Sequence, residues 1–282
     1  MNISYWPEYT ALNSVEPYSA ALESLVNAGH TLVKESYSAD AAIIWSVLWQ
    51  GRMAQNQAVW NHYQSQNKPV IVVEVGGIYR GTTWKVGING VNRDAEFGID
   101  AAIGRADSLG LKLTNWNTSG EFILVCGQHD RSLQWQGMPA MQTWFLNTYY
   151  EIRKYTSRPI LFRPHPRCRL PDIEAGLKHV YRQNPVKLHN SYDDFNLVFN
   201  NVWTTISWSS NPGPQSVIAG IPAIVGPSSL AWNVAAHNVS EIENPVYSNR
   251  QQWLDWYAGT EYTVDEISQG LPWRRLRNAL NG

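Results

Sequence analysis

The chain has 282 residues, 44% of them hydrophobic, and a formal net charge of −1 at pH 7. This length suits one large domain or two smaller ones, and the apolar content excludes a globally disordered chain. A charge so close to zero excludes recruitment of nucleic acid by bulk attraction, but not by a local basic cleft.

Cysteine usage and hydropathy narrow the class of protein further. The two cysteines, Cys126 and Cys168, are too few for a disulfide framework, and we expect both to be buried, reduced thiols. The N-terminus lacks the basic region and long apolar run of a signal peptide, and no segment reaches the roughly 18 apolar residues of a membrane span. We therefore expect a soluble, cytoplasmic protein with no membrane partner.

Short apolar runs alternate with helical patterns in the first part of the chain. The patterns predict strands at residues 3–5, 31–34, 41–45 and 69–75, and helices at residues 17–28 and 53–66. The β-branched run at 69–75 is typical of a parallel strand that is covered on both faces. The polar, turn-rich segment at 114–120 is the expected linker between two domains.

The same alternation returns after the linker. Strands are predicted at residues 122–126, 159–163, 186–188, 203–207 and 222–225, and helices at 139–155, 172–183, 192–199, 214–219, 249–258 and 264–269. Strands that alternate with helices indicate βαβ units and a mostly parallel sheet. We therefore predict an α/β fold of two Rossmann-like, doubly wound domains facing a cleft, at residues 1–116 and 117–282. Whether the last helices cross back onto the first domain stays open.

In such sheets, ligands bind beyond the carboxyl ends of the strands, so the loops there carry the functional information. Residues 163–167 read Arg-Pro-His-Pro-Arg and follow a predicted strand. The two prolines stiffen the loop, Arg163 and Arg167 offer paired donors to a phosphate, and His165 can donate or titrate near neutrality. This loop is a candidate site for an anionic, phosphate-bearing ligand.

A second candidate anion site lies at residues 207–213, Ser-Trp-Ser-Ser-Asn-Pro-Gly, where a strand gives way to a helix. Hydroxyls, small residues and a helix N-terminus together favour an anion. Gln215, in the first turn, is a candidate contact for a ribose. The phosphate-binding candidates in this segment are Ser207, Ser209, Ser210, Asn211 and Gly213.

A third candidate is the polar loop after the strand at 122–126, in which Gln128, Arg131 and Ser132 are expected to face the ligand. In the first domain, one loop follows the strand at 41–45 and carries Trp49 and Arg52. Both side chains are candidate site residues.

The loop at residues 74–85 of the first domain begins with Glu74 at a strand end beside a pair of glycines. A carboxylate there is a candidate general base, because glycine lets a substrate approach closely. Asp100 is a further catalytic candidate, and Glu96 is an alternative. Further candidate site residues in this loop are Gly76, Gly77, Arg80 and Lys85.

The loop at 163–167, the Ser-rich segment some 40 residues later and the Gly-Ile-Pro-Ala-Ile-Val that follows the helix resemble the C-terminal half of GT-B glycosyltransferases. The resemblance covers roughly residues 122–230 and is strongest to capsule-polysaccharide and glycerophosphate-type transferases. Many of these enzymes carry Glu where this chain has Gln215. The resemblance implies a nucleotide-sugar donor, such as UDP-glucose, in the second domain. It also implies that an acceptor, the second substrate, binds over the first domain at Trp49, Arg52, Gly76, Gly77, Arg80 and Lys85.

Residues 45–53, 73–77 and 80–87 are similar to glycosyltransferases of tailed phages, some of which are thought to modify hydroxymethylated pyrimidines in DNA. This resemblance implies transfer of a sugar to duplex DNA in the host cytoplasm, with the modified base flipped from the stack. Transfer would need neither metal nor cofactor, and a monomer is expected. Two other functions stay open, a capsule or surface-glycan transferase and a non-catalytic binder of nucleotides or phosphosugars.

Overall fold

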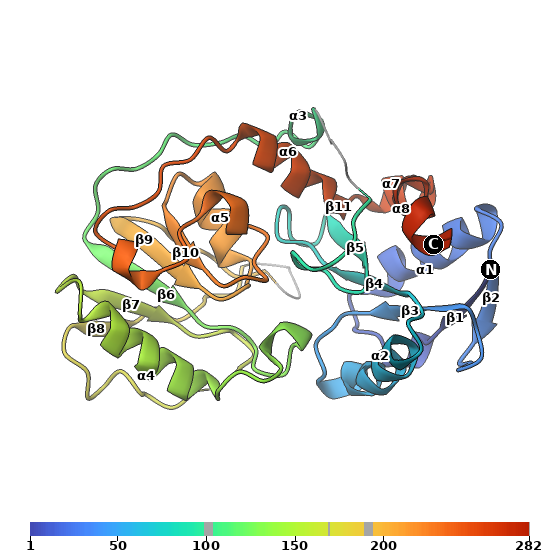
Figure 1. The fold of residues 1–282 in the computed structure, drawn as a ribbon, viewed down its shortest axis with the longest axis horizontal. Coiled ribbons are helices and arrows are strands. Elements are labelled where there is room, and N and C mark those ends of the chain that lie inside the picture. The colour runs from blue at the N-terminus through green and yellow to red at the C-terminus, as the bar shows by residue number, and fades with distance from the viewer. Residues whose placement is uncertain (99–103, 169, 189–193, 282) are drawn as a thin grey trace. The chain divides into compact units, whose positions relative to one another are not determined.

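The structure is a computed structural model and describes residues 1–98, 104–168, 170–188 and 194–281. The chain forms two compact units (Figure 1). Unit 1 comprises Met1–Arg105, Arg131–Leu133 and Asp255–Gly282, and unit 2 comprises Ala106–Asp130 and Gln134–Leu254. Unit 1 is thus assembled from both ends of the chain.

The sheet of unit 1 has a parallel part and an antiparallel edge. Its strand order is β11-β5-β4-β3-β1-β2, in which β1 to β4 are parallel while β5 and β11 are antiparallel to their neighbours. From β1 the chain adds β2 on one side and β3 on the other. The bounds are β1 Asn2–Tyr5, β2 Thr31–Lys34, β3 Ala41–Trp45, β4 Val70–Val75, β5 Trp84–Ile88 and β11 Glu261–Tyr262.

Helices cover both faces of this sheet, because its strands are apolar on both sides. Ile71 and Val73 pack in one core with α1, α7 and α8, whereas Val70 and Val72 pack in another with α2. The indole of Trp273 in α8 donates to Ser24 Oγ in α1 at 2.7 Å, which joins the two ends of the chain. The bounds are α1 Val15–Asn27, α2 Asn56–Ser65, α7 Val264–Ser268 and α8 Leu271–Asn281.

The sheet of unit 2 is parallel throughout, with strand order β10-β9-β6-β7-β8. The chain runs from β6 outward to β7 and β8, then returns to the other side of β6 for β9 and β10. The strand order therefore reverses between β6 and β9, and in open α/β sheets this switch point is where ligands bind. The bounds are β6 Phe122–Cys126, β7 Ile160–Arg163, β8 Val180–Arg182, β9 Val202–Ser207 and β10 Ala223–Val225.

One face of the unit 2 sheet packs on α4, through Phe145 against Phe162 with ring centroids 3.9 Å apart. The other face packs on Leu197, Phe199 and Ile221. The remaining elements are short. They are α3 Arg105–Ser108, α4 Met141–Ile152, α5 Pro212–Ile218 and α6 Gln251–Gly259, with 3₁₀ turns at Pro7–Tyr9, Gly51–Gln55, Leu133–Trp135, Trp232–Val234 and Val239–Glu241.

Several sequence predictions of secondary structure are wrong. The strand predicted at 186–188 is only an isolated antiparallel bridge between Lys187 and Phe195. Residues 172–183 are turns followed by β8, not a helix. The described part of the predicted helix at 192–199 is irregular, because its apolar residues alternate and bury Leu197 and Phe199 on the sheet. The loop expected at 74–85 ends in a strand, β5, and β4 is therefore parallel to β3 but antiparallel to β5.

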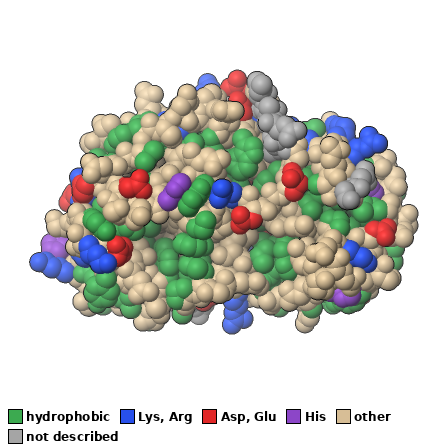
Figure 2. Space-filling model, viewed as in Figure 1, with side chains coloured by type: hydrophobic (Ala, Val, Ile, Leu, Met, Phe, Trp, Pro, Cys, Tyr) green, Lys and Arg blue, Asp and Glu red, His purple; other side chains and the backbone are tan. Residues whose placement is uncertain are grey.

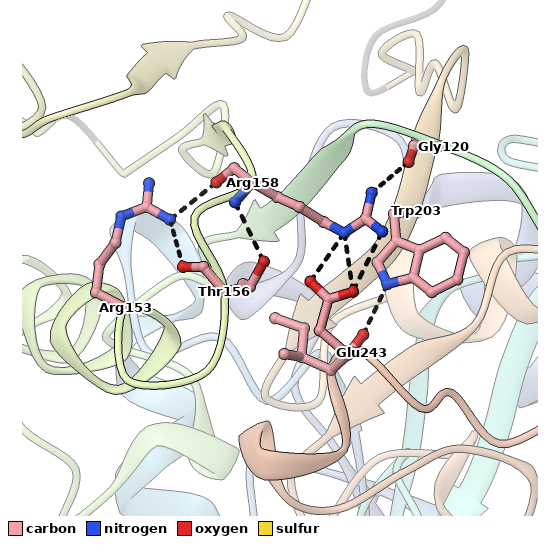
Figure 3. A network of polar contacts seen from close by, with 7 residues as sticks. Gly120, Arg153, Thr156, Arg158, Trp203 and Glu243 are labelled. Carbon is pink, nitrogen blue, oxygen red and sulfur yellow. Dashed lines mark hydrogen bonds and ion pairs between the residues drawn. The ribbon is translucent and has the colours of Figure 1, made fainter.

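A polar network ties together the amino ends of three strands in unit 2 (Figure 3). Arg158, just before β7, bonds both carboxylate oxygens of Glu243 and donates to the Gly120 carbonyl just before β6 at 2.6 Å. Its guanidinium also lies 4.4 Å from the ring centroid of Trp203 in β9. Arg153 donates to the Arg158 carbonyl at 2.8 Å. The network thus involves the amino ends of these strands and not their carboxyl ends.

Candidate functional site

The carboxyl ends of the three central strands of unit 2 are level with one another. Cys126 at the end of β6 is in register with Arg163 of β7 and with Ser207 of β9. Beyond this line, the Gln128 Oε1 accepts a bond from the Ser209 backbone N–H at 3.2 Å and from the Ser209 Oγ at 2.9 Å. The two loops on either side of the β6/β9 switch point are thereby joined, and the predicted candidates Gln128 and Ser209 lie together.

Two hydroxyls beside this bridge are covered by protein. The Oγ atoms of Ser207 and Ser210 are buried and have no hydrogen-bond partner among the described residues. A Cβ built on Gly213 would lie 2.8 Å from Ser207 Oγ, so glycine there leaves room for that hydroxyl. A buried hydroxyl without a partner is costly, so two of them at a switch point make this segment a candidate for ligand binding.

The start of α5 differs from a usual helical anion site. Its first and third residues are Pro212 and Pro214, which have no N–H, and the Gly213 N–H donates to the Ser210 carbonyl at 3.1 Å. The helix is also only seven residues long. The contribution expected of its backbone N–H groups and dipole is therefore small, and the side-chain hydroxyls become the main donors. Asn211 lies just before the helix and Gln215 in its first turn, both half-buried.

In the loop at residues 163–167, Arg163 is held by other parts of unit 2, whereas His165 lies beside a second imidazole. Arg163 is buried and its guanidinium donates to Gln183 Oε1 at 3.3 Å and to the Asn196 carbonyl. Burial lowers the pKa of Arg163 from its ordinary value. These bonds tie β7 to the segment after β8, so Arg163 has a structural task that the sequence does not reveal.

His165 is half-buried, and its Nδ1 accepts the Arg167 backbone N–H at 3.2 Å. Its ring meets that of His129 edge to face, with centroids 5.4 Å apart. His129 is buried, and its Nδ1 lies 3.5 Å from Asp130 Oδ1. The loops after β6 and β7 therefore place two imidazoles together, and the sequence predicted only one of them as a site residue.

Arg131 and Ser132 belong to unit 1, not to the unit that holds Gln128. The Arg131 carbonyl accepts the Trp49 N–H at 2.9 Å, and Ser132 forms an antiparallel bridge with Leu48. Trp49 itself is buried in the core beside α2, with its indole N–H unpartnered among the described residues. Arg52 is exposed in the 3₁₀ turn Gly51–Gln55.

Glu74 is half-buried near the end of β4, and both of its carboxylate oxygens accept hydrogen bonds. Ser46, directly after β3, donates its hydroxyl to Glu74 Oε2 at 2.5 Å, and the Val75 N–H donates to Oε1 at 2.9 Å. Ser46 is buried and has a left-handed backbone, with φ of 66°. The second predicted catalytic carboxylate, Asp100, lies outside the described residues. Glu96 is exposed and accepts the Gly98 N–H at 2.6 Å.

Glu261 is the carboxylate of unit 1 that sequence reasoning missed. It is fully buried and accepts the Gly77 N–H at 2.7 Å, the Ile78 N–H at 3.1 Å and the Thr83 hydroxyl at 2.6 Å. A Cβ on Gly76 would lie 2.4 Å from Glu261 Oε2. The two glycines therefore accommodate an internal carboxylate, a role different from the predicted contact with a second substrate. The local sequence, Gly-Thr-Glu-Tyr-Thr at 259–263, gives no signal of this contact.

Lys85 lies between these carboxylates, in register with Glu74 on one side and Glu261 on the other. It is buried, and burial lowers its pKa from the ordinary 10.5, while the charges of Glu261 and Glu74 oppose the shift and that of Arg80 adds to it. Lys85 is thus a buried member of a charged row, and Arg80 is half-exposed nearby.

Both cysteines are buried, and burial raises the pKa of the Cys126 thiol to about 12. Within the described ranges, no three His, Cys, Asp or Glu side chains gather as they would around a metal ion. No helix in those same ranges is both long enough and apolar enough to cross a bilayer.

No family model matches this sequence, and no curated protein matches it. Solved structures do resemble the fold. A KpsC β-Kdo 2,4 transferase of Thermosulfurimonas dismutans has a TM-score of 0.55 at 12% identity, over 96% of this chain and 98% of that chain. A KpsC β-Kdo 2,7 transferase of the same organism has a TM-score of 0.52 at 14% identity, over 99% of both chains. The predicted class, α/β with two Rossmann-like units of the GT-B type, is thereby confirmed as the fold of this chain.

Proposed function

We propose that this chain is a glycosyltransferase that takes a nucleotide-activated sugar as its donor and binds the donor's phosphate at the switch point of unit 2. The observation that carries the proposal is the pair of buried, unpartnered hydroxyls, Ser207 and Ser210, beside the Gln128–Ser209 bridge. Hydroxyl donors suit phosphate oxygens, and the place between β6 and β9 is where open α/β sheets bind ligands. The fold shared with two named transferases supports the same function.

The chemistry follows from what must happen to charge. When the sugar leaves its nucleotide, negative charge develops on the phosphate oxygens, and donors already in place stabilise it without reorganising. Ser207 and Ser210 supply such donors, and His165 can hold a proton at a phosphate oxygen. The acceptor hydroxyl must lose its proton, and Glu74 in unit 1 is the predicted base among the described residues.

For the acceptor, we favour a glycan hydroxyl. The two similar structures are named as β-Kdo transferases, so nucleotide-activated Kdo belongs with UDP-glucose among the donors to test. Duplex DNA with hydroxymethylated pyrimidines stays a prediction from sequence. On the face drawn in Figure 2, the described Lys and Arg side chains are dispersed among Asp and Glu, so on that face a duplex would have to rely on local contacts.

The test is a transfer assay with a panel of nucleotide sugars, each offered with a glycan oligosaccharide or with duplex DNA containing 5-hydroxymethylcytosine or 5-hydroxymethyluracil. Mass spectrometry of the acceptors reads the product. We expect a mass increase of one sugar on an oligosaccharide. An increase only on DNA would replace the glycan acceptor with the DNA acceptor, and nucleotide binding without turnover on any acceptor would replace the enzyme with a binding protein.

His165→Ala separates these two classes of function further. In a transferase, this variant should retain nucleotide binding within about tenfold and lose most turnover, because the imidazole acts on charge that develops in the transition state. In a binding protein the only effect would be on affinity. Calorimetry with the nucleotide and the transfer assay together give the comparison.

A further inference from the structure

Ser46 stands at the switch point of unit 1. From β1 the chain adds β2 on one side and β3 on the other, so the strand order reverses between β1 and β3, and Ser46 directly follows β3. Its backbone N–H continues the ladder to the Val73 carbonyl at 2.8 Å. The next residue of the neighbouring strand β4 is Glu74, the predicted base.

The backbone of Ser46 is in a conformation that serine rarely adopts. Its φ of 66° lies in the left-handed region, which glycine enters without strain and which Asn and Asp enter more often than serine does. Glycine would relieve this strain but would supply no hydroxyl. The strained serine therefore provides a group that the favoured residue lacks, and strain of this kind is concentrated at functional sites.

The Ser46 hydroxyl acts both as a donor and as an acceptor. It donates to Glu74 Oε2 at 2.5 Å and accepts the Leu48 N–H at 3.1 Å, and Ser46 is 2% exposed. The second carboxylate oxygen of Glu74 accepts the Val75 N–H, so each oxygen has one fixed donor. An acceptor hydroxyl that approaches the half-buried Glu74 can use only the lone pairs that these two donors leave.

We propose that Ser46 is a positioning residue that orients the Glu74 carboxylate for proton transfer from the acceptor. This inference rests on the proposed function, and on Glu74 as its base. Ser46 acts through Glu74 and not on the donor, whose phosphate site lies in unit 2. Loss of the hydroxyl must therefore lower kcat and leave the KM for the donor unchanged.

The experiment compares Ser46→Ala with Ser46→Gly in the full chain. Both variants lack the hydroxyl, but only glycine relieves the left-handed strain, so Ser46→Gly should melt about 2–4 °C above Ser46→Ala. We expect both to lose kcat by the same factor, about 10- to 100-fold, as for a hydrogen bond to a charged group. A serine that served only the fold would give kcat values that follow stability, with Ser46→Gly the more active.

Two further variants complete the design. His179→Gly relieves another left-handed residue, exposed just before β8, and should leave kcat unchanged. In a Glu74→Gln background the effect of Ser46→Gly should disappear, because a residue that acts through the base has nothing to orient once the base is gone.

The outcomes separate the two proposals. If the chain turns over no donor, the proposed function fails and the role of Ser46 fails with it. If turnover exists but Glu74→Gln is as active as wild type, or if the Ser46 variants keep their kcat or act additively with Glu74→Gln, the positioning role is wrong while the transferase stands. Equal losses in both Ser46 variants, absent from the Glu74→Gln background, support the positioning role.

Discussion

At the residue scale, Ser207 is expected to contribute to donor binding and not to folding. Its hydroxyl is buried without a partner among the described residues, so removing it should not destabilise the fold. We predict that Ser207→Ala unfolds in urea at the wild-type concentration or above it. Its affinity for the donor should fall about tenfold, because one hydrogen bond to an anion is lost.

Thr205 offers a matched control in the same strand. Its hydroxyl is also buried and unpartnered within the described ranges, but it lies two residues before the carboxyl end of β9. Thr205→Val removes that hydroxyl and keeps the shape of the side chain. We expect unchanged donor affinity, measured by calorimetry, and an equal loss of affinity in both variants would contradict the phosphate site.

In contrast to Ser207, Glu261 is expected to stabilise the fold of unit 1 through its carboxylate. In Glu261→Ala, the Gly77 and Ile78 N–H groups and the Thr83 hydroxyl lose their acceptor, and buried Lys85 loses a neighbouring charge. We predict a loss of about 3 kcal/mol in the free energy of unfolding, as for other broken buried charge pairs.

Urea unfolding measures this loss, with Glu121→Ala as the control. Glu121 is exposed and accepts one side-chain bond, from Asn201 at 3.1 Å, so its removal should cost less than about 0.5 kcal/mol. Equal stabilities of the two variants would show that the glycine pair is not held by Glu261.

At the scale of elements, the sequence predicts those strands and helices whose position follows from the local pattern of apolar residues. Strands β6, β7, β9 and β10 coincide with predicted strands, and the loops after β6, β7 and β9 are the predicted site loops of unit 2. Strand β5 is not predicted, because a short alternating run beside glycines is also compatible with a loop. The helix predicted at 172–183 fails because β8 pairs with β7, a contact that no local pattern records.

The same limit applies to the site. The pairing of Gln128 with Ser209 joins residues 81 positions apart, and the sequence predicts both as site residues without predicting the bond. The bonds of Arg163 to Gln183 and Asn196, and the contact of Glu261 with the glycine pair, depend on tertiary structure. The sequence therefore predicts which residues lie at strand ends. It does not predict which partner each of their side chains bonds.

The turn between β9 and α5 gives a prediction at this scale. Alanine at position 213 would place its Cβ 2.8 Å from Ser207 Oγ, closer than such atoms pack. We expect Gly213→Ala to displace the hydroxyl and to raise the donor KM about tenfold, the loss of one hydrogen bond to an anion. Gly176→Ala, where a Cβ meets nothing within 4 Å, serves as the control and should leave the donor KM unchanged. An unchanged KM in both would place the donor elsewhere.

The network at the amino ends of β6, β7 and β9 should act on stability alone (Figure 3). Arg158→Ala removes the bidentate bond to Glu243, the bond to the Gly120 carbonyl and the contact with the Trp203 ring. The side chains of Arg158 and Glu243 are about a third exposed, so we predict a modest loss of about 1–2 kcal/mol.

Urea unfolding of Arg158→Ala beside Lys154→Ala checks this. The Lys154–Glu151 pair lies on the surface of the same unit, where solvent screens the attraction, so Lys154→Ala should leave the unfolding midpoint close to that of wild type. The donor KM of Arg158→Ala should equal that of wild type. A raised KM would mean that the two ends of the sheet are coupled.

At the scale of the whole molecule, each unit is a doubly wound sheet with a distinct set of polar groups at its carboxyl edge. Unit 2 holds hydroxyls, imidazoles and an amide, which suit a phosphate, whereas unit 1 holds a carboxylate fixed by a serine, which suits a proton transfer. Segments from the two ends of the chain meet in unit 1 through Trp273 and Ser24. Under the proposed function, unit 2 would bind the donor phosphate and unit 1 would supply the base.

The most direct measurement is the transfer of a sugar from a nucleotide-activated donor to a hydroxyl acceptor by the full chain, read by mass spectrometry of the acceptor. We predict a gain of one sugar mass, with release of the nucleotide, and a donor KM that rises in Ser207→Ala but not in Thr205→Val. An acceptor left unmodified with every donor in the panel would contradict the proposed function.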